Sequence, residues 1–374
     1  MLRFSDGNDV EVFDCGRDAF PRMLAAVEAA RERVHVESYV VRNDRVGGRF
    51  LELLAERARQ GVEVRLLFDA VGSRWLDALA VDALRGAGAD VVAFNPLSRL
   101  YPHWAPRRRD HRKLLIVDGD IAFTGGLNLG DEYDAGVEDT SAARGWRDTH
   151  LAIRGPAVRD LGAVFLESWF RAGGTDLPWH TLLSEKPRHA GSVRCAVLPD
   201  GPVYRRRGVR DLLVSALDRA EETARFTSAY FAPDRVLLEA LERTAERGVR
   251  VELILAGRTD HGWLRRASRA SIGALLRRGV VVYEYGAAML HAKSAVFDRR
   301  LAVVGSSNLD RQSLRHNYEV NLVFVGSDVP GRIDELFERD LARSDEVTIE
   351  SLAGRSWLTR AIDALAAGLV SRLL

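Results

Sequence analysis

Apolar residues along the chain follow two periodicities in turn, one typical of amphipathic helices and the other typical of buried strands. In the first 95 residues helical segments and short apolar runs alternate, and several of the helical segments end at glycine. The predicted helices and strands are, in order, 17–33, 34–41, 48–60, 62–68, 77–88 and 91–94. Because alternation at this spacing is typical of layered folds, we expect an α/β domain with a largely parallel sheet.

The same order of elements returns in the second half of the chain. The corresponding segments are 210–223, 225–230, 236–248, 249–257, 270–279 and 280–285. Aligning Gly61 with Gly248 gives an offset of 187 residues (248 − 61). Internal repetition on this scale predicts two α/β/α halves related by a pseudo-twofold axis, with mostly parallel mixed sheets, at residues 1–180 and 190–350. We expect the join within 173–192, which is rich in Gly, Pro and polar residues.

Composition and the chain ends narrow the class of protein. The 374 residues are 47% hydrophobic and 29% charged, and the net charge of +1 gives no overall argument for a nucleic-acid partner. The two cysteines, Cys15 and Cys195, fit neither a disulfide framework nor a metal cluster. The first thirteen residues are charged throughout, unlike a signal peptide, and no uninterrupted apolar run predicts a transmembrane helix. Segment 351–374 has the spacing of an amphipathic helix, which could lie on a bilayer, cap the core or pack in a dimer.

One template of polar residues occurs twice, as HRKLLIVDGDIAFTGGLN at 111–128 and HAKSAVFDRRLAVVGSSN at 291–308. It begins with His-x-Lys, and Asp follows after four further residues. After another six residues it ends with Gly-(Gly/Ser)-x-Asn. The first copy supplies His111, Lys113, Asp118, Gly125, Gly126 and Asn128, and the second supplies His291, Lys293, Asp298, Gly305, Ser306 and Asn308. A single copy is commonly a solvated strand end or a turn, but two copies with identical spacing argue against chance.

Each copy predicts a buried β-hairpin, because two apolar runs flank a turn of the Asp-Gly or Arg-Arg kind. His and Lys, two residues apart on a strand, point to the same face, and the second strand returns Asn to their end. Lys and Asn can donate to the oxygens of a phosphodiester, while His can act as nucleophile or acid. Two facing copies would place these roles on opposite sides of one phosphorus. The Asp residues lie at the far end, where we expect a structural role.

These residues resemble the double HKD signature of the phospholipase D superfamily. Within it, three phrases resemble bacterial cardiolipin synthases of the short form without N-terminal membrane spans: DHRKLLIVDGDIAFTGGLNLGDEY, WRDTHLAIRGPAV and VGSSNLDRQSLRHNYEVNLVF. The resemblance implies a phospholipase D-like fold, a phosphohistidine intermediate, and no cofactor or metal. Gly126, where Ser306 stands in the second copy, departs from the general template but is usual among cardiolipin synthases.

The resemblance also implies roles for further residues. Asp148 lies 37 residues after His111 (148 − 111), and Glu319 lies 28 residues after His291 (319 − 291). Each carboxylate would hold the opposite nitrogen of an active-site imidazole, although an edge-strand carboxylate in water is the simpler alternative. The resemblance favours His111 as the nucleophile and His291 as the general acid and base.

A loop before the first motif combines basic and aromatic residues. It contains Tyr101, Trp104, Arg107, Arg108 and Arg109. Such a loop could bind a lipid headgroup at an anionic membrane, or it could be an ordinary solvated loop. The clusters 205–207 and 265–266 are expected to be ordinary basic surface.

We therefore expect a phosphatidyltransferase that converts two phosphatidylglycerol molecules into cardiolipin and glycerol, at the cytoplasmic face of the cell membrane. A phospholipase D hydrolase would use the same chemistry with water as acceptor. A nuclease would require a basic groove, which the charge pattern does not indicate. A catalytically silent lipid-binding protein is disfavoured because both motifs are intact. The sequence leaves the oligomeric state open.

Overall fold

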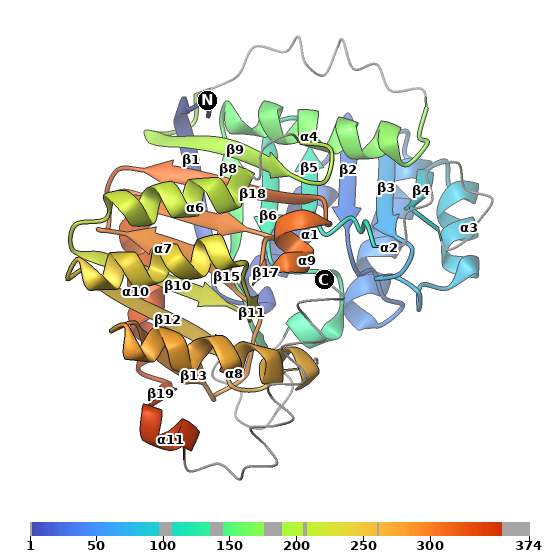
Figure 1. Cartoon of the computed structure of the whole chain (residues 1–374). Helices are drawn as coiled ribbons and strands as arrows, with labels where there is room; N and C mark the ends of the chain where they lie inside the picture. Colours follow the sequence, from blue (N-terminus) through green and yellow to red (C-terminus); the bar gives the residue numbers. More distant parts are fainter. Residues whose placement is uncertain are drawn as a thin grey trace.

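The computed structural model describes residues 2–96, 107–134, 145–175, 189–204, 208–259 and 262–353 (Figure 1). Fifteen strands form one sheet in the order β19-β13-β12-β10-β15-β16-β18-β9-β1-β8-β6-β5-β2-β3-β4. Those of the first half are β1 (Ser5–Phe13), β2 (Arg33–Ser38), β3 (Glu63–Asp69), β4 (Asp90–Phe94), β5 (Leu114–Val117), β6 (Ile121–Gly125) and β8 (His150–Arg154). Those of the second half are β9 (Val193–Asp200), β10 (Thr223–Ser228), β12 (Arg250–Ala256), β13 (Val281–Tyr285), β15 (Lys293–Phe297), β16 (Leu301–Gly305), β18 (Glu319–Val325) and β19 (Ser344–Glu346).

The strand order repeats outward from the centre of the sheet. From β1 it runs through β8, β6, β5, β2 and β3 to β4, and from β9 through β18, β16, β15, β10 and β12 to β13. Strands β1 and β9 pair antiparallel at the seam, with an irregularity between Ser5 and Asn8. The Asn8 side chain fastens this seam, donating to Val193 O at 3.1 Å and accepting from Ala157 N at 2.8 Å. The two halves therefore share one continuous sheet.

The mixed α/β fold is confirmed, but the expectation of mostly parallel strands is wrong. Parallel pairing is confined to β2-β3-β4 and β10-β12-β13. Every other pairing within the sheet is antiparallel, including the two strands of each duplicated hairpin, which a tight turn joins. Periodicity predicted the βα units but not the direction of the strands beside them.

Helices cover both faces of the sheet. The first half has α1 (Gly16–Glu28), α2 (Arg45–Arg59), α3 (Ala78–Gly86), the 3₁₀ turn η1 (Asp131–Tyr133) and α4 (Ala157–Arg171). The second half has α6 (Gly208–Arg219), α7 (Arg235–Glu246), α8 (Gly262–Arg277), α9 (Arg311–Arg315), α10 (Asp328–Leu341) and α11 (Ile349–Ala353). Figure 1 shows α6, α7 and α8 in a row over the second half.

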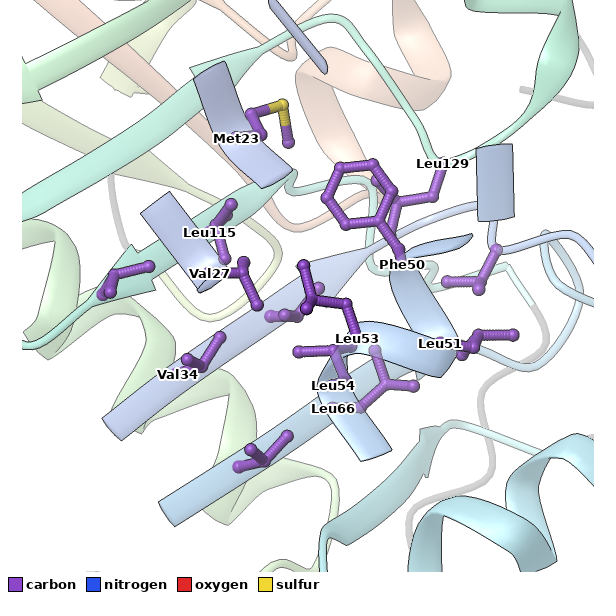
Figure 2. Packing of buried hydrophobic residues seen from close by; sticks show 14 of the residues in the cluster. Met23, Val27, Val34, Phe50, Leu51, Leu53, Leu54, Leu66, Leu115 and Leu129 are labelled. Carbon is purple, nitrogen blue, oxygen red and sulfur yellow. The ribbon is translucent and has the colours of Figure 1, made fainter. Parts of the chain in front are cut away.

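Strand β5 shows how the faces are divided. Leu115 and Val117 join the cluster under α1, α2 and α3, which Figure 2 shows around Phe50, whereas Leu114 and Ile116 face α4. The α4 cluster continues into the second half and includes Ile333 of α10. Because side chains alternate across a strand, these two sets lie on opposite faces, and the shared cluster joins the two halves.

Three further predictions concern the join between the halves, the C-terminal tail and membrane-spanning helices. The segment expected to join the halves, 173–192, and the predicted tail helix, 351–374, fall largely outside the described residues. Their boundaries therefore stay predictions. Among the described residues, no helix combines the length and the apolar character needed to cross a bilayer.

Candidate active site

The two copies of the template form the β-hairpins β5–β6 and β15–β16. At each turn two successive residues have positive φ: 52° and 67° at Asp118 and Gly119, and 50° and 54° at Asp298 and Arg299. Two central residues of this kind suit the right-handed twist of a tight hairpin. Each turn thus sends the second strand back alongside the first, toward the end that carries His and Lys.

Asp118 and Asp298 bind the backbone at the ends of the hairpins remote from the histidines. The Asp118 carboxylate accepts from the backbone N–H groups of residues 31, 32 and 33 at 2.8–2.9 Å. Asp298 accepts in the same way from residues 221, 222 and 223 at 2.8–3.0 Å. Each carboxylate therefore fixes the chain that leads into β2 or β10, which is a structural contact.

Each histidine pairs with a carboxylate from the other half of the chain. His111 Nδ1 lies 3.0 Å from both carboxylate oxygens of Glu319, and His291 Nδ1 lies 2.7 Å from Asp148 Oδ2. The backbone repeats the exchange: His111 N donates to the carbonyl of residue 318 at 2.9 Å, and His291 N donates to that of residue 147 at 2.7 Å. With Nδ1 donating to a carboxylate, Nε2 of each neutral ring keeps its lone pair for a substrate.

Strand register makes Asp148 and Glu319 equivalent. Gly125 pairs with His150, and Gly305 pairs with Asn321, so each carboxylate lies two residues before the partner of a motif glycine. The separations of 37 and 28 residues differ because the first half has a longer connection between β6 and β8. Spacing in the sequence concealed this equivalence.

The difference between Gly126 and Ser306 follows from the carboxylate beside each residue. A Cβ at position 126 would lie 1.9 Å from Asp148 Oδ1, so only glycine leaves room for that carboxylate. On the other side, Ser306 Oγ donates to Glu319 Oε2 and accepts from Val320 N at 3.0 Å. Glycine therefore lies beside the aspartate, and a serine hydroxyl lies beside the glutamate.

The two lysines and two asparagines complete the template. Lys113 Nζ donates to the carbonyl of His111 at 2.6 Å, and Lys293 Nζ makes the same bond to the carbonyl of His291. Asn128 is held on both sides, accepting from Val40 N at 3.1 Å and donating to the Tyr133 hydroxyl at 2.6 Å. The buried Asn308 Oδ1 has no hydrogen-bond partner within the described part of the chain.

Aromatic side chains surround the two imidazoles, and sequence reasoning did not assign them. The Tyr39 ring lies 5.0 Å from that of His111, in an edge-on arrangement. The His291 ring is approached by Trp146 at 5.0 Å, Tyr133 at 5.5 Å and Tyr230 at 6.4 Å. Tyr133 occurs in GDEY, shortly after the predicted Asn128, and Trp146 occurs in GWRDTH, two residues before the predicted Asp148. This closeness in sequence was the signal that could have identified them.

Two buried arginines hold this region together across the halves. Arg112 Nε donates to the carbonyl of Glu319 at 3.1 Å, and its Nη1 donates to Ser168 Oγ at 2.8 Å. Arg147 Nε donates to Asp340 of α10 at 2.9 Å. Each arginine is adjacent to a residue of a histidine–carboxylate pair, so the contacts between halves also position the pairs.

Burial controls the protonation of the site. It lowers the pKa of His291 to about 4, with Lys293 lowering it further and Asp148 opposing, and it lowers the pKa of His111 as well. Burial also lowers the pKa of Lys113 to about 8, although Glu319 opposes this. Burial alone would raise the pKa values of Glu319 and Asp148, but the facing histidines and lysines keep both below their usual range. The resting site thus holds ionised carboxylates and neutral imidazoles.

The basic loop before the first motif divides into two parts. Arg109 is buried, with its guanidinium on Asp69 at 3.4 Å and the carbonyl of Asn95 at 3.0 Å, so it is not placed to reach a membrane. Arg107 and Arg108 are exposed. The predicted contacts at Tyr101 and Trp104, like the cluster 205–207, lie outside the described residues. Arg265 pairs with Glu284.

Asp14, Cys15 and Asp18 bring three potential metal ligands within 4.8 Å of one another. Cys15 Sγ donates to Asp18 at 3.6 Å, and burial raises the pKa of this thiol to about 12. Cysteine binds a metal ion as the thiolate, so an environment that raises the pKa of the thiol opposes metal binding at Cys15. Cys195 is also buried and free.

Comparisons with known proteins agree with this geometry. The family model described as "Cardiolipin synthase, PLD-like domain" matches residues 23–136 and 213–341. A cardiolipin synthase of Alkalihalophilus pseudofirmus is 33% identical over 371 residues, covering 99% of this chain and 72% of that protein. Cardiolipin synthase A of Pseudomonas aeruginosa is 36% identical over 343 residues, covering 92% of this chain and 69% of that protein.

A solved structure shows the same fold at lower sequence identity. The phosphatidylserine synthase of Haemophilus influenzae superposes with a TM-score of 0.75 at 12% identity, covering 100% of this chain and 95% of that protein. The family model covers both halves and both hairpins, and the relatives align over nearly the whole chain. The chain therefore belongs to the phospholipase D-like cardiolipin synthase family.

Proposed function

We propose that this protein is a cardiolipin synthase, which transfers a phosphatidyl group from one phosphatidylglycerol to a headgroup hydroxyl of a second. The observation that carries the proposal is the crossed arrangement of two buried histidines, each on a carboxylate of the other half. Full-length relatives named cardiolipin synthase support the choice of substrate. We infer that it works as a peripheral protein at the cytoplasmic face of the cell membrane.

In the first step the neutral Nε2 of His111 attacks phosphorus, while Glu319 holds the proton on Nδ1. The bond from phosphorus to the glycerol oxygen breaks, and this oxygen takes a proton from His291. The phosphate brings a negative charge into the buried site, which raises the pKa of His291 and supplies the protonated form that this step needs. A phosphatidyl-histidine and free glycerol result.

In the second step a hydroxyl of another phosphatidylglycerol attacks the same phosphorus, and His291 takes its proton. The bond between phosphorus and Nε2 of His111 breaks, giving cardiolipin and the free enzyme. Lys113, Lys293, Asn128 and Asn308 would donate to the non-bridging oxygens as charge develops on them. Burial of both imidazoles beneath aromatic rings limits the access of water and favours an alcohol acceptor.

Product analysis tests the reaction directly. Purified protein incubated with phosphatidylglycerol vesicles, without added metal, should give cardiolipin and glycerol in equal amounts. Phosphatidic acid as the main product would instead make the enzyme a hydrolase with the same fold. His111→Ala and His291→Ala should each abolish turnover, and a loss of only a few-fold in either would rule out the two-histidine mechanism.

The choice of nucleophile needs a donor whose leaving group requires no proton. With phosphatidyl-p-nitrophenol, His291→Ala should release about one equivalent of p-nitrophenol in a burst, because His111 still attacks. His111→Ala should give no burst. The reverse pattern would exchange the two roles without changing the overall reaction.

A further inference from the structure

The loop between β3 and α3, together with the first turn of α3, exposes two large apolar side chains beside the candidate active site. Leu79 is 75% exposed and Trp75 is 65% exposed, which makes them the most exposed of the large hydrophobic residues described. The loop follows the carboxyl end of β3, which lies parallel to β2, and the carboxyl end of β2 pairs with the start of β5 beside Lys113. This places the loop at the sheet edge that carries the first histidine.

Hydrogen bonds fix the base of this loop to the wall of the site. The Asp69 carboxylate accepts from the N–H groups of Val71 and Gly72 at 2.9 and 3.0 Å, and from Asp110 N, next to His111, at 3.0 Å. Ser73 Oγ accepts from Val41 N at 2.9 Å and donates to the carbonyl of Tyr39 at 3.0 Å.

Tyr39 connects the loop to the chemistry. Its ring contacts His111, and its backbone and ring lie so close to Gly72 that a Cβ there would approach them to 2.2 and 2.8 Å. The exposed residues are therefore not the tip of an unsupported loop. They stand on a base that is held against the imidazole of the first motif.

The composition of this surface suits an anionic lipid interface. Arg74 lies over the Trp75 ring, 5.1 Å from its centroid, so an apolar and a cationic group are presented together. Arg107 and Arg108 are also exposed. Two contacts hold their segment in place: the Arg109 guanidinium donates to Asp69, and the Arg108 carbonyl accepts from the Asn95 side chain. Tryptophan with arginine is the combination enriched where protein meets headgroups.

The exposed acidic residues at the start of α3, Asp77 and Asp82, each have a partner in the same part of the chain. Asp77 caps α3, accepting from Leu79 N at 3.0 Å, and Asp82 pairs with Arg85 at 3.6 Å. Figure 1 shows α3 beside β4 at one end of the sheet, where its first turn extends the surface formed by the loop. Arg74 and Trp75 of the loop and Leu79 of the first turn of α3 are together named the docking loop below.

We propose that the docking loop binds the surface of an anionic phospholipid bilayer and turns the sheet edge that carries His111 toward the lipid headgroups. The inference rests on the proposed function for its choice of partner, because a synthase acting on bilayer lipids must meet them at the interface. Trp75 and Leu79 enter the interfacial layer, while Arg74 stays at the level of the phosphates.

Vesicle binding tests this without requiring turnover. The double variant Trp75→Ala/Leu79→Ala should bind phosphatidylglycerol vesicles at least about ten-fold more weakly in co-sedimentation, whereas Ile349→Ala, which removes an exposed apolar residue of α11, should change binding less than about two-fold. Fluorescence of the wild type should be quenched by vesicles of brominated lipid, and Trp75→Phe should remove part of that quenching. Equal vesicle binding by the double variant and the wild type would overturn the proposal.

Turnover of a dispersed substrate separates docking from catalysis. With short-chain phosphatidylglycerol below its micellar concentration, the double variant should keep the kcat/KM of the wild type, while its rate on vesicles should fall with its binding. An equal loss on both substrates would overturn docking in favour of a role in the site wall. Self-association lost in the variant, with vesicle binding unchanged, would assign this surface to a second copy and also overturn it.

The same measurements keep the two proposals apart. If phosphatidylglycerol gives no product but vesicle binding still depends on Trp75, the proposal for the docking loop is supported and the proposed reaction is wrong. If cardiolipin forms and vesicle binding does not depend on Trp75, the proposed reaction is supported and the proposal for the docking loop is wrong.

Discussion

Gly126 lies directly against the Asp148 carboxylate, so that a side chain at position 126 would occupy the place of an oxygen that this site needs. The Cβ of any other residue would lie 1.9 Å from Asp148 Oδ1. On the opposite side of the pseudo-twofold axis, Ser306 donates a hydrogen bond to Glu319. Two residues that match in the template are thus adapted to carboxylates of different length.

Exchanging the residues at these two positions should have unequal effects. Gly126→Ser should lower kcat by about 10² to 10⁴, because the displaced Asp148 no longer orients His291. Ser306→Gly removes the hydrogen bonds of the hydroxyl to Glu319 and to the backbone of Val320 without a clash, and its kcat should fall by about ten-fold or less. Steady-state turnover of phosphatidylglycerol, with circular dichroism to verify folding, compares the two. Similar kcat values for the variants would contradict this account.

Neutral replacement of the crossing carboxylates should separate the two steps of the reaction. Glu319→Gln and Asp148→Asn keep the shapes of the side chains but no longer fix the imidazole tautomer, and each should lower kcat by about 10² to 10⁴. With phosphatidyl-p-nitrophenol, Asp148→Asn should keep its burst, whereas Glu319→Gln should lose it.

A matched control exists outside the site. Glu63 lies 3.0 Å from His35 Nε2, forming another His–Glu contact, and Glu63→Gln should leave kcat within about two-fold of the wild type. A loss for Glu63→Gln as large as that for Glu319→Gln would mean that the effect comes from altered folding.

The pH dependence of kcat/KM should show a limb from Lys113. Burial lowers the pKa of this amine to about 8, so the free enzyme loses the cation that we propose binds phosphate as the pH rises through that value, and kcat/KM should fall above it. Lys113→Arg keeps its charge and should move the fall to higher pH. On the acid side, the lowered pKa of His111 keeps its lone pair free, so kcat/KM should hold below the ordinary imidazole pKa of about 6.5.

These pH profiles are best measured with the p-nitrophenyl donor, because the release of p-nitrophenol can be followed over the whole pH range at the wavelength where its neutral and ionised forms absorb equally. An alkaline limb that stays at the same pH in Lys113→Arg would show that another group is responsible. A fall of kcat/KM already beginning above pH 6.5 would contradict the lowered pKa of His111.

Asp118 and Asp298 should matter for stability and not for chemistry. Each carboxylate accepts three backbone hydrogen bonds, so replacement by Ala should lower the free energy of unfolding by about 1–3 kcal/mol and leave kcat of the folded fraction unchanged. Urea denaturation measures the loss. Asp120→Ala, in the same turn but with an exposed ion pair to Arg154, should cost no more than about 1 kcal/mol. A fall in kcat for Asp118→Ala would indicate a closer link to the site.

The duplicated template predicted the hairpins and the polar groups that they bring together. It could not predict which histidine each carboxylate serves, because the crossing of Asp148 and Glu319 arises from contacts between halves and not from spacing within one. Sequence patterns also missed β1 and β9. The polar run SDGNDVEVF does not have the composition of a central strand, yet β1 pairs on both sides.

The basic loop shows the same limit on a smaller scale. Three consecutive arginines look alike in the sequence, but Arg109 turns inward because Asp69, 40 residues away, offers it a buried carboxylate. In contrast, nothing in the hydrophobic pattern marked Trp75, whose exposure is determined by how Ser73 and Asp69 hold its loop. Long-range contacts decided both outcomes.

The exchange of carboxylates between halves has a consequence for how the chain is assembled. In either half alone, the imidazole Nδ1 would lack its carboxylate partner. When the two halves face each other about a twofold axis, both histidine–carboxylate pairs form. This is the geometry of an isologous dimer whose protomers have been joined into one polypeptide. The covalent join keeps the second half at a high effective concentration, so that a site which would otherwise depend on protein concentration forms within a single molecule.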